Sequence, residues 1–121
     1  MSDHNPKLVD IKSLEDARKE MNKIGCDPKG IEIMAPKAIL KVIKLEKVLL
    51  QDAFIIKQDM LSIGGEVATS WETITLKEKY GDILIMGTVA QLRELVGKLN
   101  RHYTHIQEIA RELSVLVDDI C

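Results

Sequence analysis

The segment KQDMLSIGGEVATS, residues 57–70, constrains the possible fold more than any other part of the chain. It has the pattern of a helix that ends on two glycines and continues directly into a strand. From Leu49 to Ile63, apolar residues recur every three or four positions, as on the buried side of a helix. Gly64 stands where a left-handed residue usually closes a helix, and Gly65 extends the turn. A helix joined to a strand in this way predicts one half of a βαβ crossover, which is right-handed almost without exception.

The N-terminal third is expected to hold a short strand, a helix and a turn. Leu8–Ile11 has the pattern of the strand. Ser13 can cap a helix whose apolar residues recur at helical spacing and which closes at Gly25. The sequence CDPKG, residues 26–30, has the composition of a turn. The residues after it are expected to begin in an extended conformation, because Pro36 disfavours a helical residue before it.

Residues 38–49, AILKVIKLEKVL, fit two kinds of element. Their lysines could share one face of a helix, and their apolar residues could equally form a buried strand. A short apolar run looks alike in both states, so the pattern alone does not decide. The β-branched content favours a strand, which is therefore predicted here.

The C-terminal half is expected to add a central strand and two helices. Glu72–Leu76 alternates weakly, and Tyr80–Asp82 carries a turn signal. Residues 83–86, ILIM, form a continuous apolar run, as in a strand covered on both faces. Thr88 has the spacing of a capping box for one helix, and Thr104 has the same spacing for the last.

This order of elements predicts a single α/β domain over residues 1–121, with residues 1–6 as a disordered tail. Its sheet is expected to be small and mostly parallel or mixed, and to be packed by about four helices. The order of the strands, the oligomeric state and the identity of any ligand do not follow from the sequence.

Composition excludes several classes of function. The net charge is −2, which provides no broad surface for nucleic acid or an anionic membrane. Only 3% of the residues are aromatic, so a stacking platform for bases is not expected. No apolar run approaches the ~20 residues of a membrane helix, and two cysteines are too few for a disulfide framework. A cytoplasmic protein without a cofactor is therefore expected.

Two glycine corners are candidate ligand sites. Gly87–Thr88 ends a predicted strand and opens a helix, where free amides favour an anion. Gly64–Gly65 could let a backbone approach a phosphate, although these glycines follow a helix end and match no phosphate-loop pattern. Lys37 and Lys41 begin a basic run that could bind an anionic ligand. Plain helix caps and a solvated lysine face are the alternatives that the residues favour.

Three other residue types are candidates for chemistry or binding. His102 and His105 could share a helical face, but no further ligand joins them at a spacing typical of metal sites, so no metal is expected. With Asp82, they are the first residues to test if the chain is an enzyme whose site forms across subunits. Trp71 follows a predicted strand and is a candidate interface residue. No catalytic set can be assembled, so the chain is expected not to be an enzyme.

Three separated blocks, IGCDPKGIEIMAPKAILKVIKLEKV, FIIKQDMLSIGGEVATS and DILIMGT, resemble the N-terminal accessory region fused to some bacterial dihydropteroate synthases. The blocks occur in the same order and extend over roughly residues 20–100. The matching residues are Ile24–Gly25, Asp27, Gly30–Ile31, Ile33–Ala38, Lys57–Ser62, Gly64–Gly65 and Met86–Thr88. The sequence lacks the proline that precedes the second block in those proteins.

This resemblance implies a folate or pterin context. The catalytic residues of dihydropteroate synthase belong to a (β/α)₈ barrel of ~250 residues, so none is carried over to this chain. The expected function is a docking, regulatory or oligomerisation module. Its expected partners are a separate dihydropteroate synthase-like barrel protein and further copies of itself. The alternative is a binding protein for a pterin or phosphorylated metabolite at the Gly87–Thr88 edge.

Overall fold

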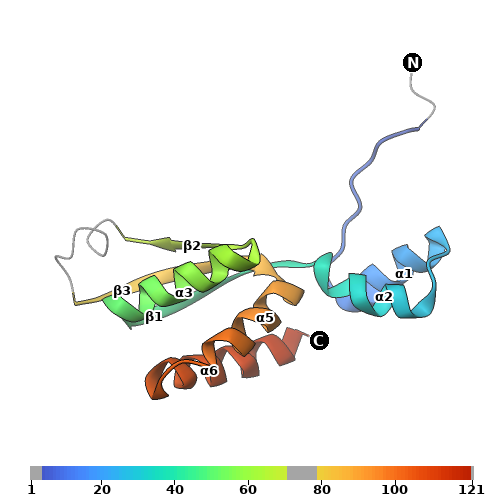
Figure 1. Cartoon of the computed structure of the whole chain (residues 1–121). Helices are drawn as coiled ribbons and strands as arrows, with labels where there is room; N and C mark the ends of the chain where they lie inside the picture. Colours follow the sequence, from blue (N-terminus) through green and yellow to red (C-terminus); the bar gives the residue numbers. More distant parts are fainter. Residues whose placement is uncertain (1–3, 71–78, 121) are drawn as a thin grey trace.

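A computed structural model describes residues 4–70 and 79–120, and confirms the α/β class (Figure 1). The described elements follow in the order α1 (Leu14–Ile24), α2 (Pro28–Met34), η1 (Ala35–Lys37), β1 (Leu40–Leu49), α3 (Leu50–Ile63), β2 (Glu66–Thr69), β3 (Tyr80–Thr88), α5 (Val89–Leu99) and α6 (Thr104–Ile120). Residues 38–49 thus form a strand over most of their length, as their β-branched content favoured.

The described sheet has the strand order β1-β3-β2, and both pairings are antiparallel. Ile85 in the central strand lies opposite Ile43 on one side and Val67 on the other. Since β1 and β2 both run against β3, they run in the same direction and α3 connects them as a crossover. The later strand β3 occupies the place between them. For this reason no described pair of neighbouring strands is parallel, and the expectation of a mostly parallel or mixed sheet was wrong in this detail.

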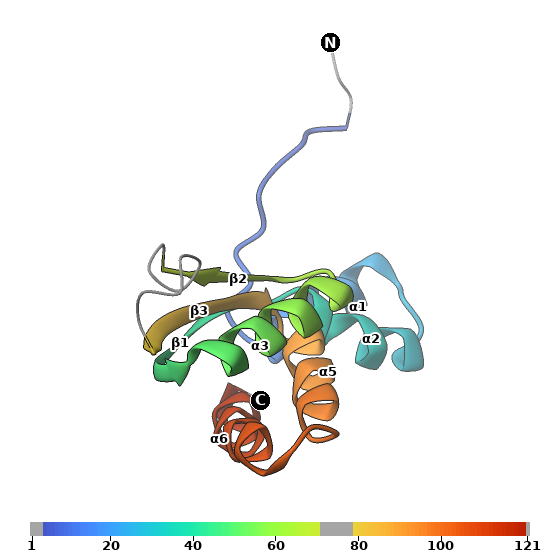
Figure 2. The same ribbon diagram turned by 60° about the vertical axis from the view of Figure 1, so that its left-hand side comes forward.

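The core lies between one face of this sheet and the helices below it (Figure 2). Helix α3 packs on the sheet, and α6 packs mainly on α5. Gly64 ends α3 with φ 105°, the left-handed conformation that its position predicted. Thr88 and Gln91 form the predicted capping box of α5. The buried side chains at the centre include Ile56, Met60, Val67, Ile83, Ile85, Leu92 and Leu95.

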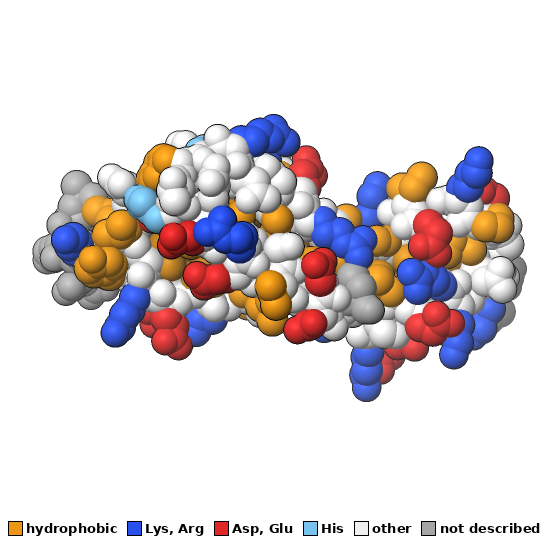
Figure 3. Space-filling model, turned by 90° about the horizontal axis from the view of Figure 1, so that it is seen from below, with side chains coloured by type: hydrophobic (Ala, Val, Ile, Leu, Met, Phe, Trp, Pro, Cys, Tyr) orange, Lys and Arg blue, Asp and Glu red, His pale blue; other side chains and the backbone are white. Residues whose placement is uncertain are grey.

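Helices α1 and α2 form a smaller unit beside the sheet, and the outline of the molecule narrows between the two parts (Figure 3). The predicted turn at residues 26–30 is instead the start of α2. Asp27 caps this helix by accepting hydrogen bonds from the amides of Lys29 and Gly30, and Pro28 fills the first turn. The extended segment expected next is also helical, because Pro36 sits at the start of η1, where its missing amide donor costs nothing.

Three further expectations changed. Leu8–Ile11 belongs to no strand in the described chain, and Leu8 is fully exposed, so no neighbouring strand satisfies its backbone. Tyr80–Asp82 begins β3 rather than forming a turn, because pairing with β1 overrides the local turn signal. The strand over residues 83–86 is central, and Ile83 and Ile85 on its inner face are buried, whereas Leu84 on the other face is 40% exposed. Trp71 and Glu72–Leu76 lie outside the described residues.

Candidate functional site

The structure brings both predicted glycine corners together around Met60 and Gln91. A Cβ added at Gly65 would lie 2.8 Å from the carbonyl oxygen of Met86, and one at Gly87 would meet Met60 Cε. A Cβ added at Gly64 would lie 3.3 Å from Gln91 Nε2. The glycines therefore permit the close approach of β3, the end of α3 and the start of α5, and side chains fill the space between them.

Three amides at the start of α5 already have acceptors within the protein. The Thr88 amide donates to Gln91 Oε1 at 2.9 Å, and the Gln91 amide donates to Thr88 Oγ1 at 3.1 Å. The Val89 amide donates to the carbonyl oxygen of Ile39 at 3.0 Å. Lys41 lies opposite Gly87 in the sheet, and Lys37 is exposed on η1. This arrangement favours a helix cap over an anion site, and ligand binding at Gly87–Thr88 stays a prediction.

The sheet face turned away from the helices carries apolar side chains. No described helix lies on this side in either ribbon view (Figures 1 and 2). Leu40, Val42 and Leu84 are 66%, 56% and 40% exposed. We call this surface the open face, defined by Leu40, Val42, Ala68, Leu84 and Met86. Lys44 and Asp82 lie on the same face and form an ion pair of 3.8 Å. Exposed apolar side chains gathered on one face are typical of an interaction surface.

Two carboxylates on α3 bind two histidines near the start of α6. His105 Nδ1 lies 2.8 Å from Asp52 Oδ2, and His102 Nε2 lies 2.9 Å from Asp59 Oδ2. Tyr103 donates a hydrogen bond of 2.9 Å to Asp52 Oδ1. The two histidines thus contact different carboxylates, and the described residues contain no cluster of three or more metal-ligating side chains. Asp52, the one buried charged residue of the described chain, was not predicted from the sequence, because its partners are more than 50 residues away.

A cleft of about 510 Å³ lies between the end of β1 and the first turns of α6. His105 lines it beside Lys44, Glu46, Lys47 and Tyr80. Strand β1 bulges at this point, and Lys47 adopts a left-handed φ of 51°. The Lys47 amide donates to Asp82 Oδ1 at 3.1 Å, which holds the bulge in place. Bulges and left-handed residues other than glycine are frequent beside functional sites.

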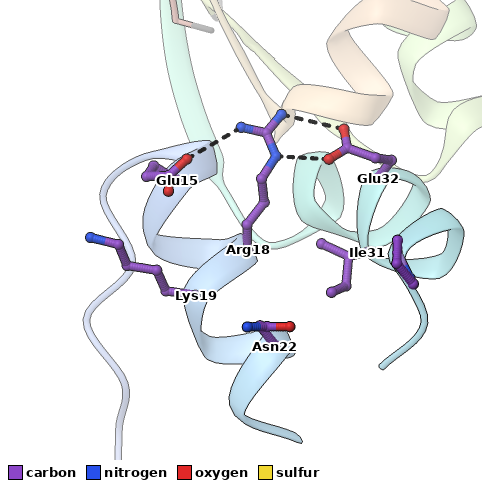
Figure 4. A pocket seen from close by; sticks show the side chains of 7 residues that line it. Glu15, Arg18, Lys19, Asn22, Ile31 and Glu32 are labelled. Carbon is purple, nitrogen blue, oxygen red and sulfur yellow. Dashed lines mark hydrogen bonds and ion pairs between the residues drawn. The ribbon is translucent and has the colours of Figure 1, made fainter. Parts of the chain in front are cut away.

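A second pocket, of about 280 Å³, lies between α1 and α2 (Figure 4). Arg18 extends across it and binds Glu32 at 3.0 Å and Glu15 at 3.7 Å. Both carboxylates thereby neutralise the guanidinium, and the arrangement joins the two helices. The pocket is accordingly a weaker candidate for an anionic ligand than the cleft beside His105.

The phenol of Tyr103 should report on this network in solution. Burial, with the neighbouring Asp52 carboxylate as the second cause, raises the pKa of Tyr103 above 10.0. Because the folded-state pKa is raised, this group's contribution to stability is complete below pH 10 and is lost as the phenol ionises at higher pH. In a Tyr80→Phe background, absorbance at 295 nm should show a midpoint above pH 10 that falls when Asp52→Asn is added. A midpoint that does not respond to Asp52→Asn would contradict the contact.

Two curated proteins are similar to this chain. One, from Halobacterium salinarum, is a probable bifunctional folylpolyglutamate synthase/dihydropteroate synthase; it is 31% identical over 108 residues, which are 87% of this chain and 13% of that protein. The other, from Helicobacter pylori, is a bifunctional dihydropteroate synthase/dihydropteroate reductase; it is 29% identical over 96 residues, or 79% of this chain and 25% of that protein. No family model and no solved structure matches the chain.

The similarity to proteins that contain dihydropteroate synthase agrees with the resemblance carried by the three sequence blocks. It covers only a small part of each relative, so it extends to a region of those proteins and not to their whole length. In the described residues, no helix is both long and apolar enough to cross a membrane.

Proposed function

We propose that this chain is a non-catalytic accessory domain of folate metabolism that docks on a dihydropteroate synthase through its open face. The observation that carries the proposal is the exposure of Leu40, Val42 and Leu84 together on one side of the sheet. A small domain that keeps such side chains in water gains free energy when a partner covers them, at roughly 25 cal/mol per Å² of apolar surface buried.

The relatives support the choice of partner. Both carry the name of dihydropteroate synthase, and the similar segment is 13% of one protein and 25% of the other. In those proteins this segment is joined covalently to the remaining length of the chain. We propose that the open face contacts the synthase part, with the Lys44–Asp82 pair at its rim. A second copy of this chain on the open face is the competing occupant.

Val42→Glu tests the docking surface, and Val115→Glu is its matched control. Val42 is 56% exposed on the open face, whereas Val115 is 65% exposed on α6. A charge at the centre of a docking surface should weaken binding to the dihydropteroate synthase of the same organism at least tenfold, or about 1.4 kcal/mol. Calorimetric titration measures this directly, and Val115→Glu should bind like the unmodified chain.

The outcomes separate the two occupants. Equal binding by Val42→Glu and the unmodified chain, or no binding by the unmodified chain, would contradict docking on the synthase. Sedimentation analysis then decides whether a second copy is bound instead, because Val42→Glu would shift a dimer to the monomer. Both variants lie on exposed surfaces, so circular dichroism and thermal unfolding should stay close to those of the unmodified chain.

The Helicobacter pylori relative favours a second candidate function. Its name adds dihydropteroate reductase to the synthase, and the chain matches a quarter of it. Under this alternative the chain would contribute to dihydropteroate reduction, with a pterin in the cleft beside His105. A pterin present at 100 times its Kd would raise the free energy of unfolding by about 2.7 kcal/mol. A thermal shift with dihydropteroate that His105→Ala removes would favour this candidate, and no shift would exclude pterin binding.

A further inference from the structure

We propose that His105 is a fixed hydrogen-bond acceptor in a small-molecule site, with Asp52 as the residue that positions it. The site is the cleft between the end of β1 and the start of α6. Its ligand class is a small organic monoanion with an O–H or N–H group. This inference is independent of docking on the open face, because none of the residues that define the open face lines the cleft, and only Lys44 at the rim of that face does so.

Asp52 determines which ring nitrogen of His105 carries the hydrogen. An ionised carboxylate accepts hydrogen bonds and donates none, so the nitrogen at 2.8 Å from Oδ2 must be the donor. That nitrogen is Nδ1. In the neutral ring, Nε2 is then without a hydrogen and presents a lone pair. A histidine oriented by a carboxylate in this way accepts hydrogen bonds from a bound molecule.

The carboxylate itself is held firmly. The side chain of Asp52 is only 3% exposed, and it lies in the first turn of α3, where the helix dipole favours a negative charge. Its other oxygen accepts the hydrogen bond from the Tyr103 hydroxyl. The Tyr103 and His105 rings meet edge to face with centroids 4.6 Å apart, which limits rotation of the imidazole. These contacts fix the ring before any ligand arrives.

The histidine is accessible as well as oriented. Its side chain is 45% exposed, and it lines a cleft whose volume of about 510 Å³ is typical of small-molecule sites. If the His105–Asp52 pair only joined α6 to α3, it would not need a cleft beside it. The His102–Asp59 pair meets that purely structural description: it joins the same parts of the chain, and neither residue lines the cleft.

The lining of the cleft defines the ligand. Leu45, Val48 and Ile109 supply apolar surface, and Lys47 lines the cleft at the bulge of β1. Among the described residues that line the cleft, Lys44 is already paired with Asp82, which leaves Lys47 as the cation for an anionic group. A molecule that fits therefore has an apolar body, one negative group for Lys47 and one donor for His105 Nε2. Glu46 and Glu112 also line the cleft and disfavour a second negative charge.

The tautomer can be tested without any ligand. Long-range ¹H–¹⁵N spectra at pH 8 should show His105 with hydrogen on Nδ1 and none on Nε2. In Asp52→Asn, the amide oxygen of the new side chain should accept the hydrogen bond from Tyr103. The amide nitrogen then faces the imidazole of His105. Because that nitrogen is a donor, Nδ1 must then accept, and the hydrogen should move to Nε2. Hydrogen on Nε2 of the unmodified chain would overturn the proposal.

The ligand class is tested with two matched probes, 4-hydroxybenzoate and 4-methoxybenzoate, which differ in the presence of the O–H donor. The unmodified chain should bind 4-hydroxybenzoate at least tenfold more tightly by NMR titration, with the largest shifts at His105 and Lys47. Asp52→Asn and His105→Ala should remove this preference, whereas His102→Ala should keep it. Equal binding of the two probes, or no binding of either, would overturn the assignment of the ligand class.

Discussion

Ile85→Ala is expected to lower the free energy of unfolding by about 2–5 kcal/mol, the usual cost of removing a large side chain from a packed core. Ile85 is fully buried at the centre of β3, between Ile43 and Val67. Its loss leaves a cavity that contacts strands on both sides and the helices beneath, so the surrounding side chains can fill it only in part. Urea denaturation followed by circular dichroism measures the change.

Leu84→Ala is the matched control, because Leu84 is the preceding residue on the opposite face of the same strand. It is 40% exposed on the open face, so its truncation should change the free energy of unfolding by less than about 1 kcal/mol. The same substitution should weaken docking on the synthase. If both substitutions destabilised the protein equally, the open face would have to be buried in the isolated chain, and the proposed function would lose its basis.

Gly65→Ala is expected to have the second largest effect, a destabilisation of about 1–3 kcal/mol. The new methyl group would lie 2.8 Å from the carbonyl oxygen of Met86, which is backbone in the central strand and cannot rotate away. Either β2 or the end of α3 would have to move. The same denaturation experiment measures this cost.

Gly97→Ala provides the comparison for Gly65→Ala. Gly97 lies in α5 and is exposed, and a methyl group added there would have no heavy atom of another part of the chain within 4 Å. Alanine at this position should stabilise the protein by about 0.5–1 kcal/mol, because alanine loses less backbone freedom than glycine when the helix forms. If Gly65→Ala were as stable as the unmodified chain, this result would contradict the close packing of α3, β3 and α5 at Gly65.

Local signals predicted much of the fold. The ends of α1, α3 and α5 each carry a cap that acts through neighbouring residues, such as Ser13 for α1 and Gly64 for α3. The error at residues 26–30 also had a local cause, since an aspartate followed by a proline begins a turn and a helix equally well. Here the helix is favoured because Ile31 is buried where α2 packs beside α1.

Long-range pairing could not be predicted in the same way. The position of β3 between β1 and β2 depends on contacts across some 40 residues, which no local pattern specifies. The Asp52–His105 contact joins residues 53 apart, and the separate signals of an aspartate and a histidine are common on any surface. The open face was not predicted, because the apolar residues of 38–49 were expected to form a buried strand.

Methyl cross-saturation from an unlabelled dihydropteroate synthase to the labelled chain tests docking on the open face most directly. Saturation should reach the methyl groups of Leu40, Val42 and Leu84, and it should bypass Ile43 and Ile85 on the inner face of the same strands. Saturation confined to Val115 and Leu116 on α6, or absent from every methyl group while the two proteins are bound, would contradict the proposed docking surface.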